Sequence, residues 1–198
     1  EAGHLFSWHM KLRGKSSGVR MTAVFDDGTV APVDLKAYIT PFQAKRFCGD
    51  PAMLRQLAQW VKADRLVVRE QTVRGPWGVP TVRRWAHRPD AIDPAHPLPA
   101  GVTTEALEAV ARRPVAVRAL VLCSYNRRKP QLLLDPSIDL AAAPLPTFGR
   151  PEWVLPLVER SRTFTEDGPW DADVRRWGAL VETDPEVVRR QARELASN

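Results

Sequence analysis

Apolar and polar side chains alternate along several short stretches of this chain, which is the pattern of half-buried β-strands. Residues 6–12 have an apolar side chain at every second position, and residues 19–25 form the next strand-like stretch. Asp27 and Gly28 then supply the pair that tight hairpin turns favour, and residues 29–33 return. Because Pro32 lacks a backbone N–H, we expect this returning strand at the edge of its sheet.

The most strand-like stretch of the chain is residues 115–125. Its apolar side chains point in both directions, so both faces are expected to be covered, with Cys123 as a small core residue. Residues 126–130 turn the chain, and residues 131–134 return as the hairpin partner. Asp135, followed by proline, is expected to end this strand and to cap the next turn.

Helices are predicted where a capping residue precedes an apolar stripe. Residues 40–43 (Thr-Pro-Phe-Gln) match a capping box, and Asp50 followed by proline repeats the start signal. Shorter helices are predicted at residues 104–112 and 185–196. The helix at residues 51–63 should pack on the strands through one stripe, formed by Met53, Leu54, Leu57, Trp60 and Val61.

Residues 75–101 are predicted to form an irregular excursion between blocks of regular structure. Six prolines divide this segment into pieces that are too short for regular elements. We expect the prolines to deny it backbone pairing and to make it the most mobile part of the chain between these blocks.

Strands outweigh helices in these predictions, which favours an α+β, strand-dominated fold with a β-sandwich or jelly-roll-like core and flanking helices. A chain of 198 residues is long enough for a single domain with its own core. No stretch approaches the roughly 18–20 consecutive apolar residues that a membrane-spanning helix needs, so none is predicted.

The chain is basic, with a net charge of +6 from 29 Lys and Arg against 23 Asp and Glu. This excess suits anionic lipid headgroups, an acidic peptide or a nucleic acid, and a merely solvated arginine-rich surface is the fourth interpretation. Aromatic residues do not alternate with the basic ones as in single-strand binders, so nucleic acid is the least favoured partner. The arginines occur in dispersed pairs: Arg83 and Arg84, Arg112 and Arg113, Arg127 and Arg128, Arg189 and Arg190.

Residues with catalytic or metal-binding chemistry are sparse. His4 and His9 have no third ligand nearby, whereas a zinc site needs about three or four. Cys48 and Cys123 lack metal-binding spacing, and whether they pair is a question of geometry that stays open. No nucleophile, phosphate-loop or dinucleotide motif occurs, so we predict no metal site and leave the catalytic residues unassigned.

The turn after residue 125 is the best candidate for ligand binding. Asn126, Arg127 and Arg128 are expected at a hairpin tip, where they can bind an acidic ligand; alternatively, Asn126 only adopts the left-handed turn conformation that it tolerates. Asp135 and Asp139 can bind a hard cation, but two carboxylates fall short of the about six to eight oxygens that calcium takes. A structural role is therefore favoured for both.

Three blocks of the sequence form an ordered pattern: FSWHMKLRGK at residues 6–15, SYNRRKPQLLLDPSIDLAA at residues 124–142 and PEWVLPL at residues 151–157. In this order they resemble the soluble C-terminal region of the vitamin K-dependent γ-glutamyl carboxylase family. That family also covers bacterial proteins described by a horizontally transferred transmembrane domain. The middle of the chain and its C-terminal tail (residues 158–198) are not matched.

The resemblance implies a membrane-bound lyase that oxidises reduced vitamin K with oxygen and carboxylates peptidyl glutamate with carbon dioxide. In this family the catalytic lysine and the quinone pocket belong to the transmembrane part. The present chain is then an extramembrane domain on the extracytoplasmic face, which engages the substrate protein and covers the membrane active site. Its partners are the transmembrane part of the same protein and a protein or peptide substrate. It is expected to hold no cofactor and to be inactive alone; another substrate, or the quinone half-reaction only, stays open.

The opening block follows the membrane exit in this family, so the resemblance places Trp8, His9 and Met10 near the bilayer surface, where a Trp ring is favoured. A tryptophan packed in the core is the alternative for Trp8. His9 stands where some members carry an acid, so no proton-transfer role is carried over to it.

Since the chain begins at Glu1 and not at Met, we expect an excised or processed piece of a longer protein; a trimmed stand-alone protein is the alternative. Two further hypotheses remain. A free-standing β-sandwich module that binds acidic peptides would have the same strands and charge, and a soluble enzyme would need a titratable cluster that the sequence does not display. Hydrophobic helices encoded upstream of Glu1 would favour the membrane protein.

Overall fold

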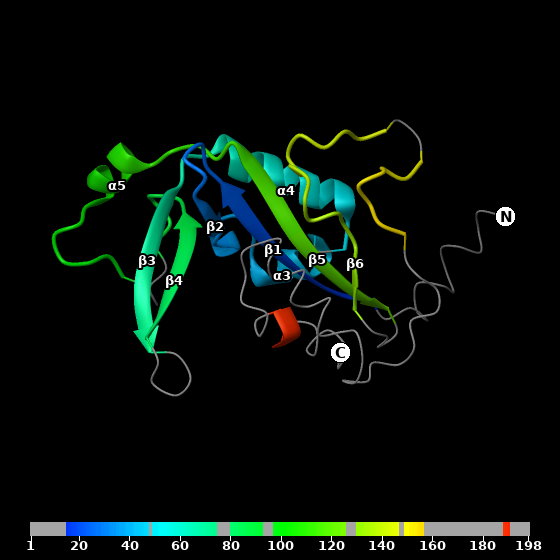
Figure 1. Ribbon diagram of the computed structural model, residues 1–198, viewed down its shortest axis with the longest axis horizontal. Coiled ribbons are helices and arrows are strands. Elements are labelled where there is room, and N and C mark those ends of the chain that lie inside the picture. The colour runs from blue at the N-terminus through cyan, green and yellow to red at the C-terminus, as the bar shows by residue number, and fades with distance from the viewer. Residues whose placement is uncertain are drawn as a thin grey trace.

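The computed structural model of the protein describes residues 15–47, 49–74, 80–92, 97–125, 130–146, 149–156 and 188–190. Its centre is a four-stranded antiparallel sheet in the order β2-β1-β5-β6 (Figure 1). The long central pair runs from the partners Lys15 and Tyr125 to Val24 and Ala116. The strands of this sheet are β1 (Lys15–Val24), β2 (Val30–Pro32), β5 (Ala116–Tyr125) and β6 (Gln131–Leu132).

The predicted hairpin turn joins β1 to β2. Gly28 has a φ of 79°, which a residue with a Cβ rarely adopts, and the Phe25 N–H donates to the Thr29 carbonyl at 2.9 Å. Arg112 closes the turn from outside, because its Nη1 lies 2.7 Å from Asp27 Oδ2 and its guanidinium stacks 4.6 Å from the Phe25 ring centre. The prediction that Pro32 lies in an edge strand is confirmed.

Both predicted helix starts are confirmed by their hydrogen bonds. Before α3 (Pro41–Phe47), the Thr40 N–H donates to Gln43 Oε1 at 2.8 Å and the Gln43 N–H donates to Thr40 Oγ1 at 3.2 Å. Before α4 (Pro51–Ala63), Asp50 Oδ1 accepts from two backbone N–H groups, at 2.9 and 3.3 Å. A short 3-10 helix, η1 (Leu35–Ala37), lies between β2 and α3.

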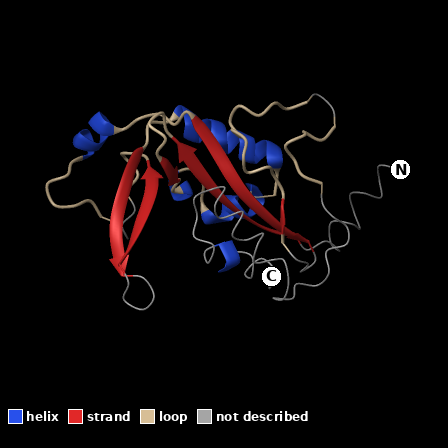
Figure 2. Cartoon of the chain, viewed as in Figure 1, coloured by secondary structure: helices blue, strands red, loops and turns tan. Residues whose placement is uncertain are grey.

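Helix α4 packs on one face of the sheet (Figure 2) and builds the main core with it. The predicted stripe is wrong for Trp60, which is 45% exposed. At 3.6 residues per turn, position 60 lies about 110° from the centre of the buried stripe, so its ring falls on the flank of the helix. The side chains of α4 that are buried are Leu54, Leu57, Ala58 and Val61.

The expectation of an irregular segment at residues 75–101 is wrong for its first part. The strand β4 (Pro80–His87) pairs with β3 (Val67–Arg74) in a regular antiparallel ladder, from Val67 opposite His87 to Arg74 opposite Pro80. Pro80 is the only proline in this ladder and stands at its first position, where a missing N–H costs little. The other prolines of the described part of this segment follow the strand.

The α+β, strand-dominated class is confirmed. The sandwich or jelly-roll arrangement stays a prediction, since the described strands form one four-stranded sheet and one two-stranded ribbon. Helix α5 (Thr104–Val110) is confirmed, and Val188–Arg190 is helical within the predicted final helix. The predicted strand at residues 6–12 lies outside the described residues. None of the described helices is both long and apolar enough to cross a bilayer.

Candidate functional site

The predicted ligand-binding turn joins two paired strands. Strand β5 ends at Tyr125, and β6 begins at Gln131, which pairs with Cys123. The Leu133 N–H donates to the Val121 carbonyl at 2.8 Å, so pairing continues beyond β6. The base of the hairpin is therefore fixed, as predicted.

The residues assigned to binding from the sequence lie outside the described residues. This holds for the candidate substrate-binding residues Asn126, Arg127 and Arg128, and for the candidate membrane-adjacent residues Trp8, His9 and Met10. Their roles stay predictions. Cys48 also lies outside the described residues, whereas Cys123 is a core residue with 1% of its surface exposed, as expected.

The turn after β6 is built by Asp135. Its Oδ1 accepts from the Ser137 N–H at 2.9 Å and from the Ser137 hydroxyl at 2.6 Å. This is the capping role expected from the Asp-Pro pair.

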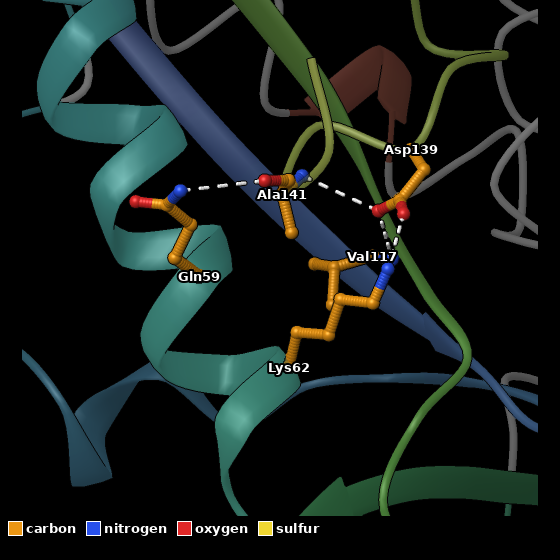
Figure 3. A network of polar contacts seen from close by, with 5 residues as sticks. All are labelled: Gln59, Lys62, Val117, Asp139 and Ala141. Atoms are coloured by element: carbon orange, nitrogen blue, oxygen red, sulfur yellow. Dashed lines mark hydrogen bonds and ion pairs between the residues drawn. The ribbon is translucent and has the colours of Figure 1, made fainter. Parts of the chain in front are cut away.

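Asp139 connects this loop to the sheet and to α4 (Figure 3). Its Oδ1 accepts from the Val117 N–H at 2.9 Å and from the Ala141 N–H at 3.3 Å. Its Oδ2 lies 2.5 Å from Lys62 Nζ. Because these donors occupy the carboxylate, the geometry agrees with the structural role favoured for Asp139. Within the described ranges, no group of three or more His, Cys, Asp or Glu side chains is arranged to hold a metal.

A second side chain of α4, Arg55, holds the same loop and is itself contacted by Gln59. Arg55 Nε donates to the Ala143 carbonyl. The Gln59 amide has two orientations with partners: its Nε2 lies 3.5 Å from the Ala141 carbonyl, or, turned over, its oxygen lies 3.1 and 3.2 Å from the Arg55 guanidinium. The second orientation has the shorter contacts and is the better one.

Trp153, in the closing block PEWVLPL, forms hydrogen bonds with both ends of the loop at residues 135–144. Its side chain is 6% exposed, and its Nε1 donates to the Pro144 carbonyl at 2.7 Å. Its own carbonyl accepts from the Asp135 N–H at 3.0 Å, and the Leu155 N–H donates to the Leu133 carbonyl at 2.9 Å. The second and third sequence blocks therefore form one hydrogen-bonded unit.

A second polar cluster was not foreseen from the sequence. Arg88 binds Asp90 through two hydrogen bonds, at 3.0 and 2.6 Å, and its Nε lies 3.7 Å from Asp64. Burial, followed by the charge of Asp64, raises the pKa of Tyr38. His87 is 2% exposed, and its Nδ1 lies 2.7 Å from the Arg88 carbonyl oxygen. The cluster joins η1, the end of α4 and the end of β4, and the only sequence signal for it is the Arg-x-Asp spacing after β4.

The sheet face opposite α4 is also covered, as expected from the pattern of β5. Leu120 and Leu122 point to this face and are fully buried, and Val188 is 1% exposed. Arg20 lies on the same face near Arg190, and burial, followed by the charge of Arg190, lowers its pKa. The short helical segment Val188–Arg190 therefore lies close to β1.

Residues 79–160 match the family model described as "Vitamin K-dependent gamma-carboxylase, lumenal domain". The match supports the assignment of this region to the gamma-carboxylase lumenal domain family. It begins just before β4, contains β5, β6 and the loop held by Asp139, and ends beyond Trp153. Searches of curated proteins and of solved structures found no match.

The gamma-carboxylase match supports the resemblance carried by residues 124–142 and 151–157, because both blocks lie inside the matched region. The opening block at residues 6–15 lies outside it. A lumenal domain belongs to the extracytoplasmic side of a membrane protein, which is the side expected from the sequence.

Proposed function

We propose that this chain is the extramembrane domain of a membrane protein related to vitamin K-dependent gamma-carboxylase, and that it engages the substrate protein and covers the membrane active site. The observation that carries the proposal is the lumenal-domain match over residues 79–160. Within that region, the turn between β5 and β6 is the candidate contact with substrate.

The surroundings of this turn support such a role. Strand β5 is paired with β1 along its whole length, and the loop after β6 is bound to α4 through Asp139. Binding residues are commonly carried on loops that a rigid scaffold positions. Arg127 and Arg128 can provide the planar, paired donors that carboxylates favour.

The redox chemistry belongs to the transmembrane part in this proposal. Reduced vitamin K, oxygen and carbon dioxide would act there, and we assign no step of the reaction to the described residues. The carboxylates of Asp135, Asp139 and Asp90 are each occupied by donors of the domain itself. The domain alone is accordingly expected to be inactive.

Titration of a soluble Glu-rich peptide against the 198-residue chain, by calorimetry at low and moderate salt, tests substrate engagement. We expect the Arg127→Ala/Arg128→Ala variant to bind at least about tenfold more weakly, because a hydrogen bond to a charged group contributes about 1.5–3 kcal/mol. The affinity of the parent should fall with salt. The matched control is Arg113→Ala/Arg150→Ala, which removes the same charge at two exposed positions. Equal affinity of the Arg127/Arg128 variant and the parent, or no binding at either salt, would contradict the proposal.

A further inference from the structure

The ribbon formed by β3 and β4 extends away from the four-stranded sheet (Figure 1). Its base is buried, with Val67 6% and Ala86 0% exposed. In its outer half the side chains of both faces are exposed, apart from the half-buried Val73, and Val82 reaches 60%. A two-stranded ribbon without a core of its own is marginally stable in water, so a partner surface would add to its order.

The ribbon is strongly basic, with four arginines against one glutamate in residues 67–87. Two of these arginines have partners within the domain. Arg69 donates to the Pro97 carbonyl at 3.1 Å and lies 5.4 Å from the Trp85 ring centre. Arg84 lies 2.6 Å from Glu70 in an exposed ion pair.

The remaining two, Arg74 and Arg83, are exposed, and no acidic side chain of the described residues forms an ion pair with either. Residues 75–79, which join the strands, contain no charged residue. The outer half of the ribbon therefore carries positive charge that the ribbon itself does not neutralise.

The positions of these two arginines distinguish between kinds of partner. Arg74 is opposite Pro80 and Arg83 is opposite Gln71, so they lie on different strands, on opposite faces and three register positions apart. Three positions correspond to about 10 Å along the ribbon. A peptide that adds to one edge contacts a single strand, whereas a plane entered tip first meets both strands and both faces. The headgroup layer of a bilayer leaflet is about 5–7 Å deep, which is less than this spacing, and the long arginine side chains can bridge the difference.

We propose that the outer rungs of the β3–β4 ribbon lie in the headgroup layer of an anionic lipid surface, and that Arg74 and Arg83 bind lipid phosphate groups there. The exposed Pro80 lies opposite Arg74, the exposed Val82 lies on a rung between the two charges, and both add apolar contact. Arginine suits this role because its planar guanidinium can donate two parallel hydrogen bonds to the oxygens of one phosphate group. This lipid contact goes beyond substrate engagement and uses no residue of the β5–β6 turn.

The test is co-sedimentation of the whole chain with vesicles of phosphatidylcholine alone or mixed with phosphatidylglycerol. The parent should bind only the mixed vesicles, and binding should fall with salt. Arg74→Gln/Arg83→Gln should lower the partition coefficient roughly 30-fold, the factor that corresponds to about 1 kcal/mol for each of two arginines at the surface. Circular dichroism should show unchanged folding, because both side chains are exposed.

The matched control is Arg113→Gln/Arg150→Gln, which has the same net charge and changes exposed residues outside the ribbon. The proposal is supported if only the ribbon variant loses binding. It is overturned if both variants lose binding equally, if the ribbon variant binds like the parent, or if the parent binds neutral vesicles as well. The proposal is also overturned if the parent protein binds poly-glutamate through Arg74 and Arg83 but does not bind the mixed vesicles. That result would favour an acidic peptide as the partner.

Discussion

Replacing Asp139 with alanine is expected to lower the free energy of unfolding by about 2–4 kcal/mol. The largest part of this loss in stability comes from the backbone N–H of Val117, which loses its hydrogen-bond acceptor. Val117 is fully buried, with 0% exposure. A buried polar group without a partner costs about 1–3 kcal/mol. The Ala141 N–H has the longer bond, 3.3 Å, and contributes at the lower end of that range. The ion pair with Lys62 is partly exposed and adds less than about 1 kcal/mol.

Two companion variants separate these contributions. Asp139→Asn keeps an oxygen that can accept from both N–H groups, but it loses the charge and turns its NH2 group towards the Lys62 ammonium. Because only this partly exposed ion pair is lost, we expect a cost of about 1 kcal/mol. Lys62→Met keeps the carboxylate bonds and should cost a similar amount. In the cycle that combines Lys62→Met with Asp139→Asn, the coupling energy should stay below about 1 kcal/mol.

The measurement is guanidinium unfolding followed by tryptophan fluorescence, with the free energy extrapolated to water. The reasoning would be refuted by an Asp139→Ala variant within about 0.5 kcal/mol of the parent, which is the range of an ordinary surface change. It would also be refuted if Asp139→Asn were as unstable as Asp139→Ala, since the charge and not the backbone bonds would then dominate.

Two further predictions concern the turn after β1 and the core face of α4. The hydrogen bond from Arg112 lowers the pKa of Asp27 from 3.8 to about 2, so the stability that Asp27 contributes should be complete above pH 3.8 and should be lost as the pH falls towards 2. Thermal melts of the parent and Asp27→Asn should therefore converge at low pH, and a constant difference from pH 5 to pH 2 would contradict this. Leu57→Ala should lower the free energy of unfolding by about 2–5 kcal/mol, because Leu57 is fully buried. Trp60→Ala should lower it much less in the same denaturant assay, because Trp60 is 45% exposed. Equal losses of stability in the two variants would contradict this packing.

The features that the sequence predicts well depend on neighbouring residues. The capping box at Thr40 and Gln43, the cap at Asp50, and the turn at Gly28 are each formed within about four positions, so their residue types specify them directly. The alternation in β5 also predicts which of its side chains share a face of the sheet, because the strand period is two.

The features that were missed depend on distant parts of the chain. The prolines around β4 are a local signal against a strand, but pairing with β3 outweighs it because only Pro80 falls inside the ladder. Lys62 and Asp139 are 77 residues apart, and nothing near either residue indicates its partner. The cluster of Tyr38, Asp64 and Arg88 likewise joins three elements that only the fold brings together. For the candidate contacts at Asn126, Arg127 and Arg128, the sequence predicts the hairpin and its base but not a ligand.

The pairing of β1 with β5 also bears on how the domain is made. The innermost partners, Val24 and Ala116, are separated by about 90 residues, and closing a loop of that length costs about 4 kcal/mol of chain entropy. Local units such as the β1–β2 hairpin and α4 can form early, but the sheet needs β5, which the ribosome supplies only about 90 residues after β1. Contacts so distant in sequence slow folding. During that interval β1 presents an open hydrogen-bonding edge, so nascent chains that stop before Ala116 should be prone to aggregate and should depend on chaperones.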